Sequence, residues 1–225
     1  MPGGLRLAQT KRALVIGGSM SGLLAALALT RRGWEVAIHE RVAEPLAGRG
    51  AGIVAQPELK AALRALGLDA GSDLGVDVPT RVMYARDGHV THRLGIAQTM
   101  TAWDRVFHLL KAALPDTSYH RGKELRRVEQ RGGVTAHFAD GTTAEGDILV
   151  GADGIRSTVR QQYLPDVAPL YAGYTAWRGL IAESTFPPAL HAALLGFNHP
   201  VTKENLSFES PIPADMQELF RRLSV

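Results

Sequence analysis

The chain has 225 residues, of which 45% are hydrophobic, a formal net charge of +3 and no cysteine. This length suffices for one or two hydrophobic cores. The lack of cysteine excludes disulfides and thiolate chemistry, and the scattered basic residues argue against a nucleic-acid groove. The longest apolar run, residues 23–29, is too short to cross a membrane. Residues 1–10 are predicted to be a leader without a signal-peptide core. We therefore expect a cytoplasmic protein that binds neither membranes nor nucleic acid.

The first regular stretch of the chain predicts a strand, a glycine turn, a helix and a second strand. Residues 12–16 form an apolar run of strand length, and GGSMSG follows at residues 17–22. Residues 23–32 are rich in leucine and alanine and predict a helix, which Gly33 ends. A second strand is predicted over residues 34–39. This βαβ pattern predicts an α/β fold with a Rossmann-like parallel sheet.

The glycine turn predicts a binding site for a dinucleotide. A helix that starts directly after a strand points its free N–H groups and positive dipole end at a phosphate. Gly17 allows the sharp turn, Gly22 lets the helix pack closely, and Ser19 adds a hydroxyl at the middle position. Glu40, at the end of the second strand, is placed to accept hydrogen bonds from an adenosine ribose.

The same turn has two other interpretations. Gly17-Gly18-Ser19-Met20-Ser21 resembles the nucleophile elbow of hydrolases, G-x-S-x-G, except that serine stands at its last position. An elbow normally follows several strands, whereas this turn follows the first, so the hydrolase interpretation is disfavoured. The turn could also be a structural feature of an α/β domain that binds nothing.

A second glycine-rich loop follows, with Gly48, Gly50 and Gly52 in close succession. Such a loop either presses its backbone against a planar or phosphate ligand or is an ordinary turn, and the sequence leaves both open. Pro57 is placed for the first turn of a helix that ends at Gly67.

Strands and one helix are predicted over the middle of the chain. Residues 80–95 predict two strands joined by a turn at Asp87-Gly88. A helix is predicted over residues 101–114, with Thr101 as its N-cap. Residues 127–150 are β-rich and turn at Asp140-Gly141. The inward-facing residues are predicted to be Val106, Leu109, Leu110 and Ala113 of the helix and Val134, Ala136 and Phe138 of the strands.

A third glycine-containing turn, GADG at residues 151–154, precedes a predicted helix over residues 155–163. Asp153 could accept hydrogen bonds from ribose hydroxyls or cap the helix, and both roles stay open. Arg156 and Arg160 share one helix face, where they could meet a pyrophosphate or solvent; solvent is favoured for Arg160. The eight histidines are scattered, and no metal site is expected.

With GGSMSG and Glu40-Arg41, GRGAGIVAQPE and GADGIRS in this order, the chain resembles the class A flavoprotein aromatic hydroxylases, the para-hydroxybenzoate hydroxylase group. GIVAQPEL and YAGYTAWRG make it most similar to the members that act like 2,6-dihydroxypyridine 3-hydroxylases. The resemblance implies an FAD-binding Rossmann-like domain of the GR2 type over residues 11–165, with an inserted β segment over about 72–98. Residues 166–225 would then begin a β-rich substrate domain and form a C-terminal segment.

The resemblance also implies which residues bind the cofactor and substrate. The ring pocket would include Tyr174, Trp177 and Arg178, and no catalytic side chain is assigned. The residues expected to contact FAD are Gly17, Gly18, Ser19, Met20, Ser21, Gly22, Glu40, Arg41, Gly50, Ala51, Gly52, Ile53, Val54 and Asp153.

The activity implied by the family is hydroxylation of an electron-rich aromatic or N-heteroaromatic ring, such as a hydroxypyridine or phenol, by O2 and NADH or NADPH through a flavin C4a-hydroperoxide. The chain departs from the family in carrying Trp103 where many members have arginine. It is also about half as long, and no Gly-Asp segment follows Phe186. We therefore expect a truncated chain.

Two alternatives follow from this expectation. One is a non-catalytic flavin- or nucleotide-binding module that needs a partner chain, since an exposed sheet edge would favour a homodimer. The other is an NAD(P)-dependent dehydrogenase, which the GADGIRS turn disfavours.

Overall fold

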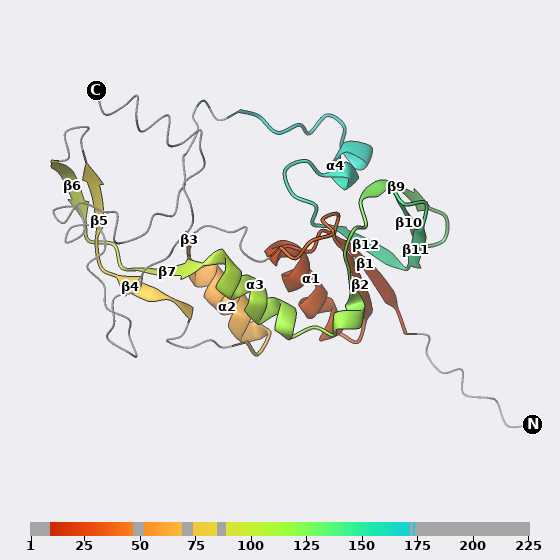
Figure 1. Ribbon diagram of the computed structural model, residues 1–225, viewed down its shortest axis with the longest axis horizontal. Helices are drawn as coiled ribbons and strands as arrows, with labels where there is room; N and C mark the ends of the chain where they lie inside the picture. Colours follow the sequence, from red (N-terminus) through yellow and green to blue (C-terminus); the bar gives the residue numbers. More distant parts are fainter. Residues whose placement is uncertain (1–9, 47–51, 69–73, 85–88, 172, 174–225) are drawn as a thin grey trace, which may run out of the picture. The chain divides into compact units, whose positions relative to one another are not determined.

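The computed structural model describes residues 10–46, 52–68, 74–84, 89–171 and 173. The chain divides into two compact units (Figure 1). The described residues of the first unit are 10–46, 58–68 and 104–171, and those of the second are 52–57, 74–84, 89–103 and 173.

A parallel sheet forms the centre of the first unit, which confirms the predicted α/β, Rossmann-like class. Its strand order is β12-β1-β2-β8, and all three neighbouring pairs are parallel. β1 and β2 are buried from their second residue onward because the helix that connects them and a second sheet cover them, as is usual for parallel sheets. Their bounds are β1 (Arg12–Ile16), β2 (Glu35–His39), β8 (Tyr119–His120) and β12 (Ile148–Gly151).

Helix α1 (Met20–Thr30) connects β1 to β2 and starts earlier than predicted. The predicted start was Leu23, but the helix begins at Met20, so that Gly22 lies inside its first turn. Leucine and alanine at the buried positions explain the close packing of the helix on the strands. Gly33 has the positive φ of +79° that the predicted helix end requires.

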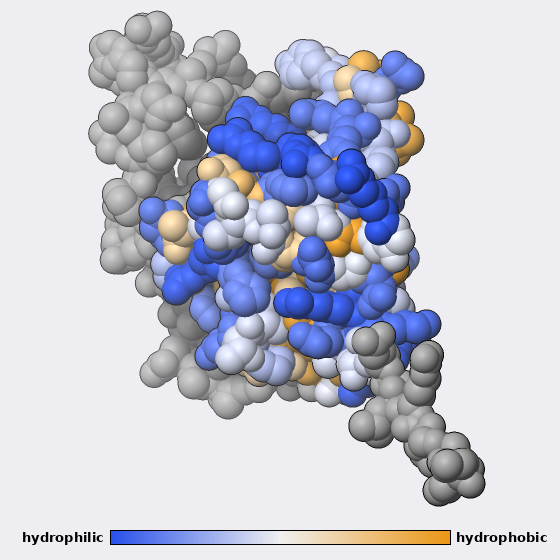
Figure 2. Space-filling model, turned by 90° about the vertical axis from the view of Figure 1, so that its right-hand side faces the viewer, coloured by the Kyte–Doolittle hydropathy of each residue, from blue (hydrophilic) through white to orange (hydrophobic). Residues whose placement is uncertain are grey.

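An antiparallel sheet covers the other face of the parallel sheet (Figure 1). Leu14 and Ile16 of β1 belong to one buried cluster with Val134, Ala136 and Phe138, as predicted from the alternation of the latter three. The turn at Gly141 has the predicted positive φ, +82°. Figure 2 shows a mostly hydrophilic surface on the side of the unit that carries this sheet. Its strand order is β11-β10-β9, with bounds β9 (Leu125–Gln130), β10 (Val134–Phe138) and β11 (Thr143–Gly146).

The predicted helix over residues 101–114 starts later than expected. Thr101 is not its N-cap, because Thr101 belongs to strand β7 (Gln98–Ala102) and pairs there with Ile53. The prediction that Ala113 faces inward is also wrong: Ala113 is exposed, and Phe107 is buried with Val106 and Leu110. The helices of this part of the chain are α2 (Pro57–Ala65), which starts as predicted, α3 (Trp103–Ala112) and the short 3-10 helix η2 (Asp116–Ser118).

The second unit is built from short antiparallel strands. One sheet has the order β3-β7-β4, with β3 (Gly52–Val54) and β4 (Val76–Val78) on either side of β7. The hairpin predicted over residues 80–95 forms from β5 (Arg81–Tyr84) and β6 (Val90–Leu94). Its predicted turn at Asp87-Gly88 lies outside the described residues.

Candidate cofactor site

The glycine turn lies at the carboxyl ends of β1, β2 and β12, where ligands bind in open α/β sheets. Gly17 has φ +105°, and its N–H donates to the carbonyl oxygen of His39 at 2.9 Å. A Cβ on Gly17 would overlap the carbonyl group of Ala152, and one on Gly22 would overlap the carbonyl oxygen of Gly17. These two glycines therefore have the steric roles that the sequence predicted, a sharp turn and close helix packing.

The backbone of Gly18 is held from both sides. Its N–H donates to Oε2 of Glu40 at 2.7 Å, and its carbonyl oxygen accepts a hydrogen bond from Oη of Tyr119 at 2.9 Å. A Cβ at this position would overlap the Tyr119 phenol. Tyr119 was not among the predicted site residues, because it lies 101 positions along the chain and no local motif surrounds it.

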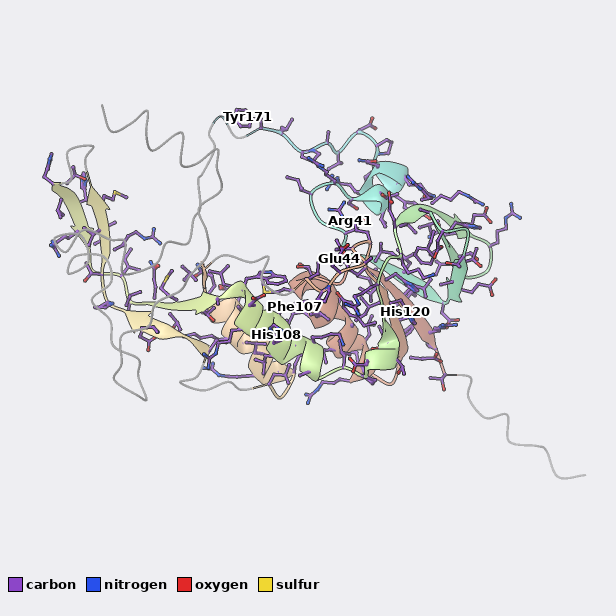
Figure 3. The ribbon with its side chains drawn as sticks, viewed as in Figure 1. Arg41, Glu44, Phe107, His108, His120 and Tyr171 are labelled. Atoms are coloured by element: carbon purple, nitrogen blue, oxygen red, sulfur yellow. The ribbon has the colours of Figure 1, made fainter. Side chains whose placement is uncertain are left out.

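Glu40 is buried, with 6% of its surface exposed. Besides Gly18, it accepts a hydrogen bond from the N–H of Val42 through Oε1 at 2.9 Å. Each carboxylate oxygen can accept a second hydrogen bond, so the predicted contact with an adenosine ribose remains compatible with this arrangement. Arg41 follows in the loop after β2 and is exposed (Figure 3).

The first turn of α1 offers backbone donors to a negatively charged ligand. Ser19 is the N-cap, with extended backbone, and within the described residues its hydroxyl makes no capping hydrogen bond. The first turn carries no acidic residue, so its N–H groups and positive dipole end are not neutralised from within the helix. Met20 begins the helix, and Ser21 is exposed beside it. Together with Gly17, Gly18 and Gly22, which leave no room for a Cβ, this donor set fits a diphosphate.

The ring of His39, at the end of β2, stacks on that of His120 and lies tilted against that of Phe138. His39 has 5% of its surface exposed, and among the described residues neither of its ring nitrogens has a hydrogen-bond partner. Its ring lies 5.1 Å from that of His120 and 4.6 Å from that of Phe138, between centroids. Burial lowers the pKa of His39 to about 4, assisted by the positive charges of His120 and Lys123. His39 is therefore neutral at neutral pH.

The GADG turn lies next to the glycine turn, because the N–H of Ala152 donates to the carbonyl oxygen of Ile16 at 2.7 Å. The helix that follows, α4 (Thr158–Tyr163), begins later than the predicted Ile155, which is 73% exposed. Ser157 is its N-cap and accepts a hydrogen bond from the N–H of Arg160 at 2.9 Å. Gly154, at the end of the turn, has a positive φ of +77° and therefore lies outside the helix.

Asp153 has the capping role that the sequence left open. Its Oδ2 accepts hydrogen bonds from the N–H groups of Thr158 at 2.7 Å and Val159 at 3.3 Å, and its Oδ1 from the hydroxyl of Ser157 at 2.5 Å. A carboxylate at a helix N-terminus is stabilised by the helix dipole. Contact between Asp153 and a ribose remains a prediction.

Arg160, for which solvent was favoured, lies at the surface but is not fully exposed. It is partly buried, and its guanidinium donates to the carbonyl oxygens of Gly154 and Ile155, so that it stabilises the turn before α4. Arg156 is exposed, which is compatible with both predicted partners, solvent and a pyrophosphate.

The other predicted site residues belong to the second unit or lie outside the described residues. Gly52, Ile53 and Val54 form β3 in the second unit, and a Cβ on Gly52 would come no closer than 4.0 Å to the carbonyl oxygen of Thr101. The remaining predicted residues lie outside the described part of the chain: Gly50, Ala51, Tyr174, Trp177 and Arg178.

Two other features, a metal site and a membrane span, are absent from the described ranges. Among these residues, no cluster of three or more histidine or acidic side chains could hold a metal ion. Within the same ranges, no helix has the length and apolar character needed to span a membrane.

Comparison with known proteins identifies relatives of this fold and site. Residues 10–168 match the family model described as FAD binding domain. The chain is 39% identical over 176 residues to 2,6-dihydroxypyridine 3-monooxygenase of Paenarthrobacter nicotinovorans, covering 76% of this chain and 43% of the relative. It is 35% identical to 6-hydroxynicotinate 3-monooxygenase of Pseudomonas fluorescens, covering 85% of this chain and 52% of the relative.

Solved structures agree with these matches. The structure of 2,6-dihydroxypyridine-3-hydroxylase from Arthrobacter nicotinovorans superimposes with a TM-score of 0.66 and 36% identity, covering 73% of this chain and 42% of that one. Klebsiella pneumoniae HpxO complexed with FAD and uric acid gives a TM-score of 0.59 and 27% identity, covering 72% and 44%. The chain spans about half the length of the curated relatives it matches. The chain belongs to the FAD-binding domain family and is related to the FAD-dependent aromatic hydroxylases.

Proposed function

We propose that this chain binds FAD and acts in the hydroxylation of an electron-rich aromatic or N-heteroaromatic ring, with O2 and NADH or NADPH as co-substrates. The observation that carries the proposal is the glycine turn at the start of α1, where Gly17, Gly18 and Gly22 leave no room for a Cβ and Glu40 is held beside the helix N-terminus. The family match over residues 10–168 supports FAD as the dinucleotide.

Each part of the turn has a distinct role in this proposal. The N–H groups at the start of α1 bind the diphosphate of FAD. Glu40 accepts hydrogen bonds from the adenosine ribose through its remaining lone pairs, and Arg41 covers the adenosine side from the loop. Asp153 keeps the second turn in shape by holding the N-terminus of α4. Gly50 to Val54 are proposed to contact FAD as well.

When bound, FAD would supply the redox chemistry that couples oxidation of the reduced nicotinamide to insertion of one oxygen atom of O2 into the ring, the other atom being released as water. The protein's part is to bind and orient both partners and to exclude water. No side chain of this chain is assigned as a catalytic acid or base.

The substrate class is inferred from the relatives' names. Two of them act on 2,6-dihydroxypyridine and on 6-hydroxynicotinate, both hydroxylated nitrogen heterocycles. We propose a hydroxypyridine-like or phenol-like ring for this protein, contacted by Tyr174, Trp177 and Arg178.

The first test is retention of FAD. The purified chain is incubated with FAD and desalted, and the visible flavin absorption bands are recorded. Retained bands that ADP displaces support the proposed site. A folded chain that retains no flavin at saturating FAD contradicts the binding proposal for this chain.

The second test addresses the reaction. Oxidation of NADH and NADPH is followed with and without 2,6-dihydroxypyridine, and the product is analysed by mass spectrometry for one added oxygen atom. Stimulated oxidation together with an oxygenated product supports the monooxygenase. Flavin retention without oxygenation would favour a flavin-binding module that needs a partner chain. Light scattering on the same sample measures whether the chain forms the expected homodimer.

A further inference from the structure

We propose that Tyr119 is a positioning residue for the diphosphate-binding turn: its hydroxyl sets the orientation of the peptide group between Gly18 and Ser19. The inference deepens the proposed function and rests on it, because the turn is the proposed FAD site. The observation behind it is the hydrogen bond of 2.9 Å from Tyr119 Oη to the carbonyl oxygen of Gly18.

The orientation of this peptide group matters because of its planarity. In a trans peptide the carbonyl and the following N–H lie in one plane and point in opposite directions. When Tyr119 holds the Gly18 carbonyl, the N–H of Ser19 is therefore directed away from the phenol. Ser19 is the N-cap of α1, so this N–H belongs to the group of donors at the helix N-terminus.

Glu40 and Tyr119 form hydrogen bonds with the two backbone groups of Gly18. Glu40 accepts the N–H of Gly18 at 2.7 Å, while Tyr119 donates to its carbonyl. With both backbone groups of Gly18 held, two successive peptide planes of the turn are fixed before any ligand arrives. Preorganised donors of this kind bind an anion without a further loss of conformational freedom.

Tyr119 is itself held in place. It belongs to β8, which pairs with the end of β2, and its partly buried ring lies 5.0 Å from Nζ of Lys111. Lys111 is in turn paired with Asp116 at 2.6 Å. Burial and the nearby Glu40 charge raise the pKa of Tyr119 to about 12. The phenol therefore keeps its proton, and its role as donor, throughout the neutral range.

The test compares Tyr119→Phe with Tyr171→Phe, which removes the same hydroxyl from an exposed position. Tyr171 is 76% exposed on the segment after α4, away from the turn (Figure 3). Dissociation constants for FAD, ADP and adenosine are measured on the full chain by flavin fluorescence and competition, at a temperature where thermal unfolding shows every variant folded.

We expect Tyr119→Phe to weaken FAD and ADP binding roughly tenfold, about 1.4 kcal/mol, and to leave adenosine unchanged because adenosine has no diphosphate. Tyr171→Phe should change none of the three. Unchanged ADP affinity in Tyr119→Phe, or an equal loss for adenosine and ADP, overturns the positioning role while the FAD site stands. Failure of the wild-type chain to bind FAD and ADP overturns the proposed function together with this inference.

Discussion

The buried His39 predicts a specific loss of stability in mild acid. Its ring stacks on that of His120 and packs tilted against that of Phe138, and both ring nitrogens lack partners among the described residues. Its pKa is about 4 in the folded chain and 6.5 when exposed, because burial disfavours the charged imidazole. A histidine with a lowered pKa contributes stability above pH 6.5 that is lost as the pH falls toward 4, because only the unfolded chain takes up the proton.

The size of the effect follows from these two pKa values. Each unit of pKa shift corresponds to about 1.4 kcal/mol, so the full effect approaches roughly 3 kcal/mol below pH 4. Between pH 7.5 and pH 5 the free energy of unfolding should fall by about 2 kcal/mol through this residue alone. This is a large part of the usual stability of a small domain.

The assay is urea unfolding of the wild type and of His39→Phe at several pH values from 7.5 to 5. Phenylalanine keeps a ring between His120 and Phe138 but cannot take up a proton. The difference in unfolding free energy between variant and wild type should therefore change by about 2 kcal/mol across this range. His92→Phe, at an exposed position of β6, controls for the general effect of replacing a histidine. Parallel pH profiles for wild type and His39→Phe would refute the reasoning.

Three further substitutions test the turns themselves. Gly22→Ala should destabilise the protein by more than about 3 kcal/mol because its Cβ overlaps a backbone carbonyl, whereas Gly95→Ala, with nothing within 4 Å, should be near neutral in thermal unfolding. Glu40→Gln should weaken FAD binding about tenfold, since it removes the charge that accepts two backbone N–H groups. Glu145→Gln, at an exposed position, should leave FAD binding unchanged. A Glu40→Gln variant that binds FAD as tightly as the wild type would contradict the role of Glu40. Asp153→Asn should lower the free energy of unfolding by about 1 kcal/mol in urea titrations, through weaker capping of α4; an unchanged midpoint would show that the capping bonds contribute little.

Much of the fold could be predicted because its signals are local. The run from Arg12 to Ile16, the following glycines and the leucine- and alanine-rich segment lie within a few residues of one another, and each has a direct conformational meaning. The same holds for the turn at Asp140-Gly141, where glycine takes the required positive φ. The predictions were wrong where a tertiary contact overrode a local conformational preference. Thr101 has the chemistry of an N-cap, yet pairing with Ile53 places it in a strand.

The βαβ unit, the roles of Gly17 and Gly22 and the acid at the end of β2 could all be predicted from the sequence. These features depend on backbone conformation and on spacing along one short stretch. The contacts that hold the turns depend on the tertiary fold: Tyr119 reaches Gly18 because β8 pairs with β2, and Arg160 folds back onto the carbonyl of Ile155. Hydrogen-bond partners distant in sequence are selected by how strands pair and pack, and the sequence around a polar side chain gives no sign of the partner it will meet.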